Sequence, residues 1–318
     1  MPSEDRIAAA IETGRQKAEA ILKSRADALT RRKAALEQNA KTLSFRAGMA
    51  AREIAGAPTL TLQTAGYLAA LGDSWFDYPF HDVLKALEDD HGYNIESTAH
   101  KGDPIEKMAY QGGQIDGFAR KLEKIQAHGA APKAVLISGG GDDVAGTEFG
   151  MLLNNADSPI AGWNNDVVGG LVDPQERIYT AYVSMISSVW RTFVEYFPNH
   201  ELHILVHGYD YPVPDGRGFF GGWPFPGPWL EPGFREKNFA DLQTRIDMMR
   251  EVMDRFNQLV AALRFPNVTI HYVDLRNTLS TALAGDAYKQ WWANELHPTE
   301  KGFAAVANKF AAVLSGIP

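Results

Sequence analysis

Short apolar runs that alternate with stretches of helical spacing are the feature that most limits how this chain can fold. The runs lie at 67–71, 93–97, 134–138, 202–207 and 268–273. The stretches that follow them lie at about 81–90, 114–128, 175–197, 236–264 and 299–314. Short strands separated by helices predict an α/β fold, with a parallel sheet covered by helices on both faces. In such sheets ligands bind beyond the carboxyl ends of the strands, so the residues after each run are candidates for chemistry.

The first part of the chain has no strand-like run. It is rich in Ala, Glu, Lys and Arg and contains no Pro between Ser3 and Ala57. This composition predicts one long helix, broken at Gly14 or Gly48. The helix is expected to end before the turn that contains Pro58.

We therefore divide the chain into an N-terminal helical segment, 1–56, and a domain that covers 57–318. Three interpretations of the segment are open. It can lie over the domain as an amphipathic helix, form a homo-oligomer, or bind a membrane surface or another anionic partner. A seven-residue Leu repeat gives weak support to oligomerisation, at Leu22, Leu29, Leu36 and Leu43.

Composition and charge exclude several classes of protein. The 318 residues include no Cys, which excludes a disulfide scaffold, a Cys nucleophile and a Cys-ligated metal site. A net charge of −8 does not suit a nucleic-acid binder, so no nucleic-acid partner is expected. No apolar run approaches the ~18 residues that span a bilayer, and the first residues lack the pattern of a signal peptide. We expect no integral membrane segment and a cytoplasmic location, with non-classical export left open.

The first strand-like run leads into Gly72, Asp73 and Ser74. A Ser that directly follows a buried strand can present its hydroxyl to the crevice beyond the sheet, which suits a nucleophile. Taken alone, however, Gly-Asp-Ser is also a common turn sequence, in which the Ser simply caps a helix.

Two further groups occupy comparable positions. The third run leads into three Gly residues followed by Asp142 and Asp143, and these glycines let the backbone approach a ligand closely. This is not a phosphate-binding loop, because the Lys-Ser/Thr that should follow is missing. His297 stands before Pro298 and the last helical stretch. A lone His there is more often structural than catalytic.

The combination is more specific than its parts. The chain resembles the SGNH (GDSL-type) hydrolase family in three motifs and in their order. These are Gly-Asp-Ser after the first run, the Gly-rich Asp loop after the third, and His-Pro before the last helix. Gly102, in the segment after the second run, resembles the glycine of that family's second block. The resemblance covers about 65–316. It implies a flavodoxin-like three-layer α/β/α sandwich with a five-stranded parallel sheet, and the cleavage of esters or related acyl groups without a metal or other cofactor.

The resemblance also implies a role for each matching residue. Ser74 resembles the nucleophile, and His297 resembles the general base that takes its proton and returns it to the leaving alcohol. The backbone N–H groups of Ser74 and Gly102, together with Asp142, resemble the oxyanion hole. Asn294 stands where the family has the acid that orients the His.

Two of these positions depart from the family pattern. The family usually has Asn where this chain has Asp142, and Asp where it has Asn294. An ionised Asp142 would repel an oxyanion, so it can donate a hydrogen bond only if burial raises its pKa and keeps it protonated. Asn294 can accept a hydrogen bond from the His297 ring but cannot stabilise an imidazolium by charge. Backbone carbonyls or Glu295 are alternative partners for the ring.

A further hypothesis follows from the departures. Asp142 could pair with protonated His297 and so supply the missing negative charge from the opposite side. Replacement of Asp142 by Asn would then lower the apparent pKa of the base.

Two long connections are expected to wall the crevice. The segment 209–234 is rich in aromatic residues, Pro and Gly, so it cannot be helix or central strand, and we interpret it as a lid or an apolar wall. The segment 146–174 carries Asn and Asp clusters typical of turns; their spacing does not match a calcium loop, and no metal site is predicted. The expected pocket residues are Asp73, Trp75, Asp143, Tyr209, Tyr211, Trp223 and Trp229.

The sequence thus predicts a serine hydrolase that cleaves a small or polymeric carboxylic ester through an acyl-enzyme on Ser74. Two alternatives remain open. The same site could transfer the acyl group to an alcohol instead of water, or the chain could be a catalytically weak binding or scaffold protein that keeps the crevice. The departures at Asp142 and Asn294 favour the scaffold, whereas Ser74, Gly102 and His297 favour the enzyme.

Overall fold

The structure is a computed structural model that describes residues 3–46, 64–145, 148–172, 177–222 and 224–318, and the side chains of all these except 28 and 32–46. Its centre is a five-stranded sheet in which every neighbouring pair is parallel, in the order β2-β1-β3-β6-β7. The strands are β1 (Gly66–Leu71), β2 (Tyr93–Ser97), β3 (Pro132–Ile137), β6 (His203–His207) and β7 (Thr269–Val273). The five predicted strands are therefore confirmed, with ends that differ by at most two residues.

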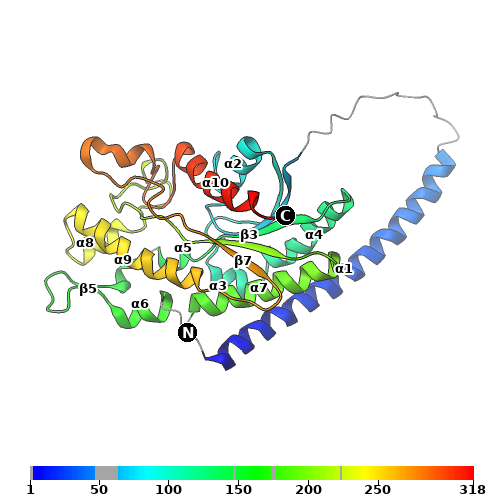
Figure 1. The fold of residues 1–318 in the computed structure, drawn as a ribbon, viewed down its shortest axis with the longest axis horizontal. Coiled ribbons are helices and arrows are strands. Elements are labelled where there is room, and N and C mark those ends of the chain that lie inside the picture. The colour runs from blue at the N-terminus through cyan, green and yellow to red at the C-terminus, as the bar shows by residue number, and fades with distance from the viewer. Residues whose placement is uncertain (1–2, 47–63, 146–147, 173–176, 223) are drawn as a thin grey trace.

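Helices cover both faces of this sheet, which confirms the three-layer α/β/α sandwich (Figure 1). On one face α2 (Val83–His91) packs against α10 (Glu300–Ser315). The other face carries α3 (Ile105–Tyr110), α4 (Gln114–Ala127) and α7 (Arg177–Tyr196). The twenty-residue helix α9 (Leu242–Ala261) contacts β6. Apolar residues of the helices and strands form one continuous buried core between the layers.

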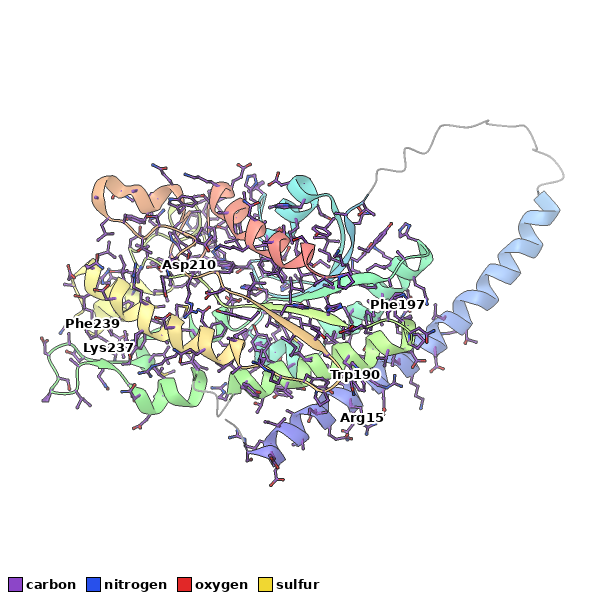
Figure 2. The ribbon with its side chains drawn as sticks, in the orientation of Figure 1. Arg15, Trp190, Phe197, Asp210, Lys237 and Phe239 are labelled. Carbon is purple, nitrogen blue, oxygen red and sulfur yellow. The ribbon has the colours of Figure 1, made fainter. Side chains whose placement is uncertain are left out.

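The predicted N-terminal helix is α1 (Glu4–Arg46), and its first half runs along α7, outside the three layers (Figures 1 and 2). The predicted break at Gly14 is wrong. A Cβ at Gly14 would lie 2.1 Å from the carbonyl oxygen of Ser184, so the residue lets two helices approach closely and does not interrupt either. The Ser188 hydroxyl donates to the Gly14 carbonyl at 2.9 Å and supports the crossing.

The other expectations for this segment are only partly covered by the structure. Gly48 and the boundary between 56 and 57 lie outside the described residues, as do the side chains of Leu36 and Leu43. Leu29 is exposed and Leu22 is partly exposed. Among the described residues, no helix combines the length and the hydrophobicity needed to cross a membrane.

The two long connections contain more regular structure than predicted. The first holds a 3₁₀ turn η2 (Phe149–Leu152), a small hairpin of β4 (Leu153–Asn154) and β5 (Gly162–Trp163), and α6 (Asn165–Val172). The second holds η3 (Phe219–Gly221) and α8 (Glu231–Glu236). The expectation that 209–234 contains no helix is wrong at its end, because Pro232 stands in the first turn of α8, where its missing N–H costs nothing. The remaining elements are α5 (Gly141–Val144) and η4 (Ala284–Gln290).

Candidate active site

The turn after β1 is fixed by contacts with residues of other elements. Gly72 is required there because a Cβ would lie 2.7 Å from the Cβ of Ser138, in the neighbouring strand end. The side chain of Gln114, at the start of α4, accepts from the Gly72 N–H and donates to its carbonyl, both at 2.8 Å. The same amide also donates to Asp103 at 2.9 Å. Ser74 therefore sits on a turn whose backbone is tied to the next layer of the fold.

The structure brings Ser74 and His297 together, although they lie 223 residues apart. His297 Nε2 is 2.7 Å from Ser74 Oγ, and His297 Nδ1 is 3.0 Å from Asn294 Oδ1. The same Asn294 oxygen accepts the backbone N–H groups of Leu296 and His297 at 3.0 and 2.9 Å, so this atom must be the carbonyl oxygen of the amide. Because an amide oxygen only accepts, the ring proton is on Nδ1, and Nε2 is free to accept from the Ser74 hydroxyl.

Aromatic rings enclose this pair. Tyr78 stacks on the His297 ring, with 4.2 Å between the ring centroids, and its hydroxyl accepts from Asn294 Nδ2 at 2.9 Å. Trp229 meets the other side of His297 edge-on, at a centroid distance of 5.7 Å. Burial lowers the pKa of His297 to about 3 and raises the pKa of Tyr78 to about 12. The imidazole is thus held neutral, in a fixed orientation, within hydrogen-bond distance of Ser74.

Glu295 does not orient the His297 ring. Its carboxylate is fully buried and accepts four backbone N–H groups, from Gly216 at 3.0 Å, Trp229 at 2.6 Å, Leu230 at 2.8 Å and Glu231 at 2.9 Å. The alternative that Glu295 replaces the family's acid is therefore wrong. The residue instead ties the aromatic-rich segment to the loop that carries His297.

Asp142 lines the same cleft as Ser74 and has a carboxyl oxygen without a partner. Its Oδ2 atom is buried, and no described residue forms a hydrogen bond with it. Burial, together with the nearby carboxyl groups of Asp73 and Asp143, raises the pKa of Asp142 to about 8. A protonated Asp142 fits this position, because a carboxylic acid can donate a hydrogen bond where a carboxylate cannot.

The hypothesis of an Asp142–His297 ion pair is not supported. The ion pairs among the described residues do not include these two, and burial alone accounts for the low pKa of His297. The two side chains line the same cleft without pairing.

Two backbone N–H groups complete this side of the cleft. In the described part of the chain, no acceptor takes the N–H of Ser74 or of Gly102. Gly102 has φ of +77°, a left-handed conformation that favours glycine. Both residues line the cleft together with Asp142. The residues that the sequence assigned to the oxyanion hole therefore gather around one volume next to Ser74 Oγ.

Two cavities meet at Ser74. The outer cleft, of about 340 Å³, is lined mainly by rings and by the His297 loop. The inner cavity, of about 40 Å³, is lined by Ser74 and by buried residues and is largely apolar. Ser74, Asp142 and Leu296 line both. The outer cleft is also lined by Tyr78, Pro79, Lys101, Gly102, Phe219, Phe225, Pro226, Trp229 and His297.

The predicted pocket residues divide between these cavities and the interior. Trp229 lines the outer cleft, whereas Asp73, Trp75 and Tyr209 are buried and line the inner cavity. Asp73 accepts from the Tyr209 hydroxyl and from the backbone N–H of Trp75, so its carboxylate supports the turn. Trp223 lies outside the described residues.

Two of the predicted pocket residues were misplaced. Tyr211 lines neither cavity, because its hydroxyl turns to Asp254 of α9 at 2.9 Å. Asp143 also faces away from both, and accepts the Ile105 backbone N–H at 2.7 Å at the start of α3.

Sequence reasoning missed several residues of the site. Tyr78 lies in an aromatic run that directly follows Ser74, and this run was the available signal. No local pattern pointed to Gln114 or Asp210, and Glu295 was considered only as a partner for the His297 ring. Asp210, labelled in Figure 2, is fully buried and accepts the N–H groups of Asn277 and Leu279, which joins the loops that follow β6 and β7. Among the described residues, no three His, Asp or Glu side chains are grouped so as to hold a metal ion.

Comparison with known proteins concerns the fold. No family model matches the sequence, and no curated protein matches it. A provisionally assigned GDSL-like lipase from Parabacteroides merdae is 13% identical, with coverage of 82% of this chain and 100% of that one and a TM-score of 0.38. A provisionally assigned SGNH hydrolase from Slackia heliotrinireducens is 14% identical, with coverage of 78% and 98% and a TM-score of 0.40. A carbohydrate esterase family 3 protein from Talaromyces cellulolyticus is 14% identical, with coverage of 79% and 96% and a TM-score of 0.38. These names agree with the family that the sequence resembles, but at such identities and TM-scores they carry no conclusion on activity.

Proposed function

We propose that this protein is a serine hydrolase of the SGNH type, which cleaves carboxylic esters through an acyl-enzyme on Ser74. The observation that most supports the proposal is the 2.7 Å contact between Ser74 Oγ and His297 Nε2, with the opposite ring nitrogen held by Asn294. Ser74 Oγ attacks the ester carbonyl carbon while His297 Nε2 takes its proton. The imidazolium gives this proton to the leaving alcohol. Water then attacks the acyl carbonyl carbon while the same nitrogen takes its proton. The bond between this carbon and Ser74 Oγ breaks, the imidazolium returns the proton to Oγ, and the acid leaves.

Negative charge develops on the carbonyl oxygen during each attack. The N–H groups of Ser74 and Gly102 and the protonated carboxyl of Asp142 are the proposed donors to this oxygen. The raised pKa of Asp142 and its unpartnered Oδ2 support this role. Each such donor is typically worth about 10²–10³ in rate. An acid at this position does the work of the family's Asn as long as it keeps its proton.

Asn294 is proposed as a positioning residue that fixes the His297 tautomer. Because the amide is neutral, it does not stabilise the imidazolium by charge, and the proton stays on His297 only briefly between Ser74 and the alcohol. An Asp-to-Asn change in a serine-protease triad costs about 10⁴ in kcat, chiefly because the tautomer becomes wrong. Here the contacts of Asn294 keep the productive tautomer, so a much smaller loss is expected.

Labelling with a fluorophosphonate tests the proposal. The intact mass of the protein should rise by one phosphonyl group, and Ser74→Ala should abolish both this label and the hydrolysis of p-nitrophenyl acetate. Ser315→Ala, at the far end of α10, is the matched control and should label fully. A native protein that neither labels nor hydrolyses the ester contradicts the proposal and favours the binding-protein alternative. Formation of a new ester when an alcohol is added would instead identify acyl transfer on the same site.

A further inference from the structure

The position of His297 decides which part of an ester each cavity can hold. The imidazole must give its proton to the oxygen of the leaving alcohol, so that oxygen has to lie on the His297 side of Ser74. His297 lines the outer cleft but not the inner cavity. The alcohol part of the substrate therefore lies in the outer cleft. The acyl group leaves the carbonyl carbon in the opposite direction and points into the inner cavity.

The inner cavity limits the length of this acyl group. Its volume is about 40 Å³, whereas an apolar cavity of about 150 Å³ is needed to hold a benzene ring. At about 25 Å³ for each carbon of that ring, the inner cavity has room for one or two carbons beyond the carbonyl. Its walls include Leu230, Trp292 and two residues of α9, Met249 and Met253, all of them buried. This lining suits a methyl or ethyl group and excludes a long chain.

The outer cleft is larger and has a different surface. Its 340 Å³ are bordered by the rings of Tyr78, Phe219, Phe225 and Trp229. Phe219 and Phe225 pack against each other, and Phe225 is about half exposed, so a ring entering from solvent meets an aromatic wall. Flat apolar faces gain most from such a wall, through burial and through edge or offset stacking.

We propose that the substrate is a short-chain acyl ester, acetyl or propionyl, of an alcohol that carries a flat apolar or aromatic ring. This inference rests on the proposed function. Met249 and Met253 set the acyl length, and Phe225 contributes to the choice of alcohol.

A series of p-nitrophenyl esters tests the acyl side with the wild-type chain. The value of kcat/KM should fall at least tenfold from acetate to hexanoate, and further to octanoate. On the alcohol side, benzyl acetate should exceed methyl acetate at least tenfold in kcat/KM. The two leaving alcohols have similar acidity, so this ratio reports binding.

Variants then assign these preferences to residues. Met253→Ala and, separately, Met249→Ala should raise the ratio of hexanoate to acetate activity at least fivefold. Met248→Ala is the matched control, because Met248 lies on the same helix and borders a different depression. Phe225→Ala should lower the ratio of benzyl to methyl acetate activity, whereas Phe80→Ala, at a ring that is 72% exposed and outside the cleft, should not change it.

The possible failures are distinguishable. If Ser74 still takes the fluorophosphonate but activity is constant or rises from acetate to octanoate, the assignment of the inner cavity is overturned while the proposed function stands. The assignment is likewise overturned if the ratio of hexanoate to acetate activity does not change in Met249→Ala and Met253→Ala, provided that both variants have the melting temperature of the wild type. If Ser74 takes no label and no ester of any length is cleaved, the proposed function fails and the inference fails with it.

Discussion

Two carboxyl groups next to the Ser74–His297 pair have opposite surroundings. Glu295 is fully buried, and four backbone N–H groups donate to its two oxygens. Asp142 lines the cleft and has a buried oxygen without a partner, and the nearby carboxyl groups of Asp73 and Asp143 disfavour its ionisation. Burial raises the pKa of both groups, but only Glu295 has donors that act in the opposite direction.

This difference separates a structural carboxyl group from one that is available for chemistry. All the hydrogen-bonding capacity of Glu295 is used in joining the segment 216–231 to the His297 loop. Asp142 keeps a buried oxygen without a hydrogen-bond partner, which leaves it available for the proposed contact with the substrate oxyanion. Burial of a carboxyl group therefore does not by itself indicate whether the group is structural or functional. The number of hydrogen-bond donors around the carboxyl group does indicate this.

The largest expected effect follows from removal of the Glu295 carboxylate. Glu295→Ala leaves four backbone N–H groups without an acceptor, each at a typical cost of ~1–3 kcal/mol where the group is buried. We expect the free energy of unfolding in urea to fall by at least about 3 kcal/mol. Glu300→Ala, at an exposed carboxylate, is the control and should change it by less than about 0.5 kcal/mol. A small loss in Glu295→Ala would show that the segment is held by its rings and not by this carboxylate.

Removal of the Asp142 carboxyl group should lower the rate of the reaction. Asp142→Leu deletes the proposed donor to the oxyanion, so kcat for p-nitrophenyl acetate should fall about 10²–10³-fold. Asp142→Asn restores a donor of the same size and should keep activity within about tenfold of the wild type. If both variants lose activity equally, or neither does, Asp142 is not a donor in the reaction.

The dependence of activity on pH should show the ionisation of Asp142. The proposed donor exists only while Asp142 is protonated, so activity should decline as pH rises through about 8, by about tenfold for each further unit. His297 must be neutral, and because its pKa is lowered to about 3, the acid limb should lie well below pH 6.5. In Asp142→Asn the alkaline decline should disappear while the acid limb stays. An alkaline limb that survives this substitution would assign it to another group.

The last expected effect concerns stability as a function of pH. Because the pKa of Asp142 is 3.8 in the unfolded chain and higher in the folded one, the folded state binds this proton more tightly. The resulting stabilisation is complete below pH 3.8 and is lost as pH rises through about 8. Asp142→Asn titrates in neither state, so it should gain stability over the wild type between pH 4 and 8. In urea unfolding, the difference between this variant and the wild type should grow from pH 4 to about pH 8 and stay constant above it. A pH-independent difference would contradict the shifted pKa.

The sheet was predictable because its signals are local. Five apolar runs of strand length, each followed by helical spacing, appeared in the structure as five parallel strands with ends within two residues. The residues after three of these strand ends, Ser74, Gly102 and Asp142, gathered at one edge because parallel strands all end there. His297 joined them from the loop before α10.

The errors came from features that depend on distant parts of the chain. Gly14 was expected to break a helix, but it permits the contact with α7. Tyr211 was expected in the pocket, but its hydroxyl found Asp254 on a helix more than forty residues later. Glu295 was considered as a partner for His297, but four N–H groups of another segment surround it. None of these partners lies close enough in the sequence to leave a local pattern.

The sequence by itself determined the α/β class, the strand order in the chain and the residue types available at the strand ends, because these depend on spacing and on chemistry within short segments. It also showed that Asp142 and Asn294 depart from the family pattern, which leaves open whether Asp142 is protonated and which tautomer His297 adopts. Only the tertiary structure decided the answer, since the protonation of a carboxyl group and the tautomer of an imidazole depend on which dipoles and charges surround them in space. The division of the crevice into a short inner cavity and a wide outer cleft was decided at the same level, because its walls come from helices and loops that are distant in sequence and meet only after folding.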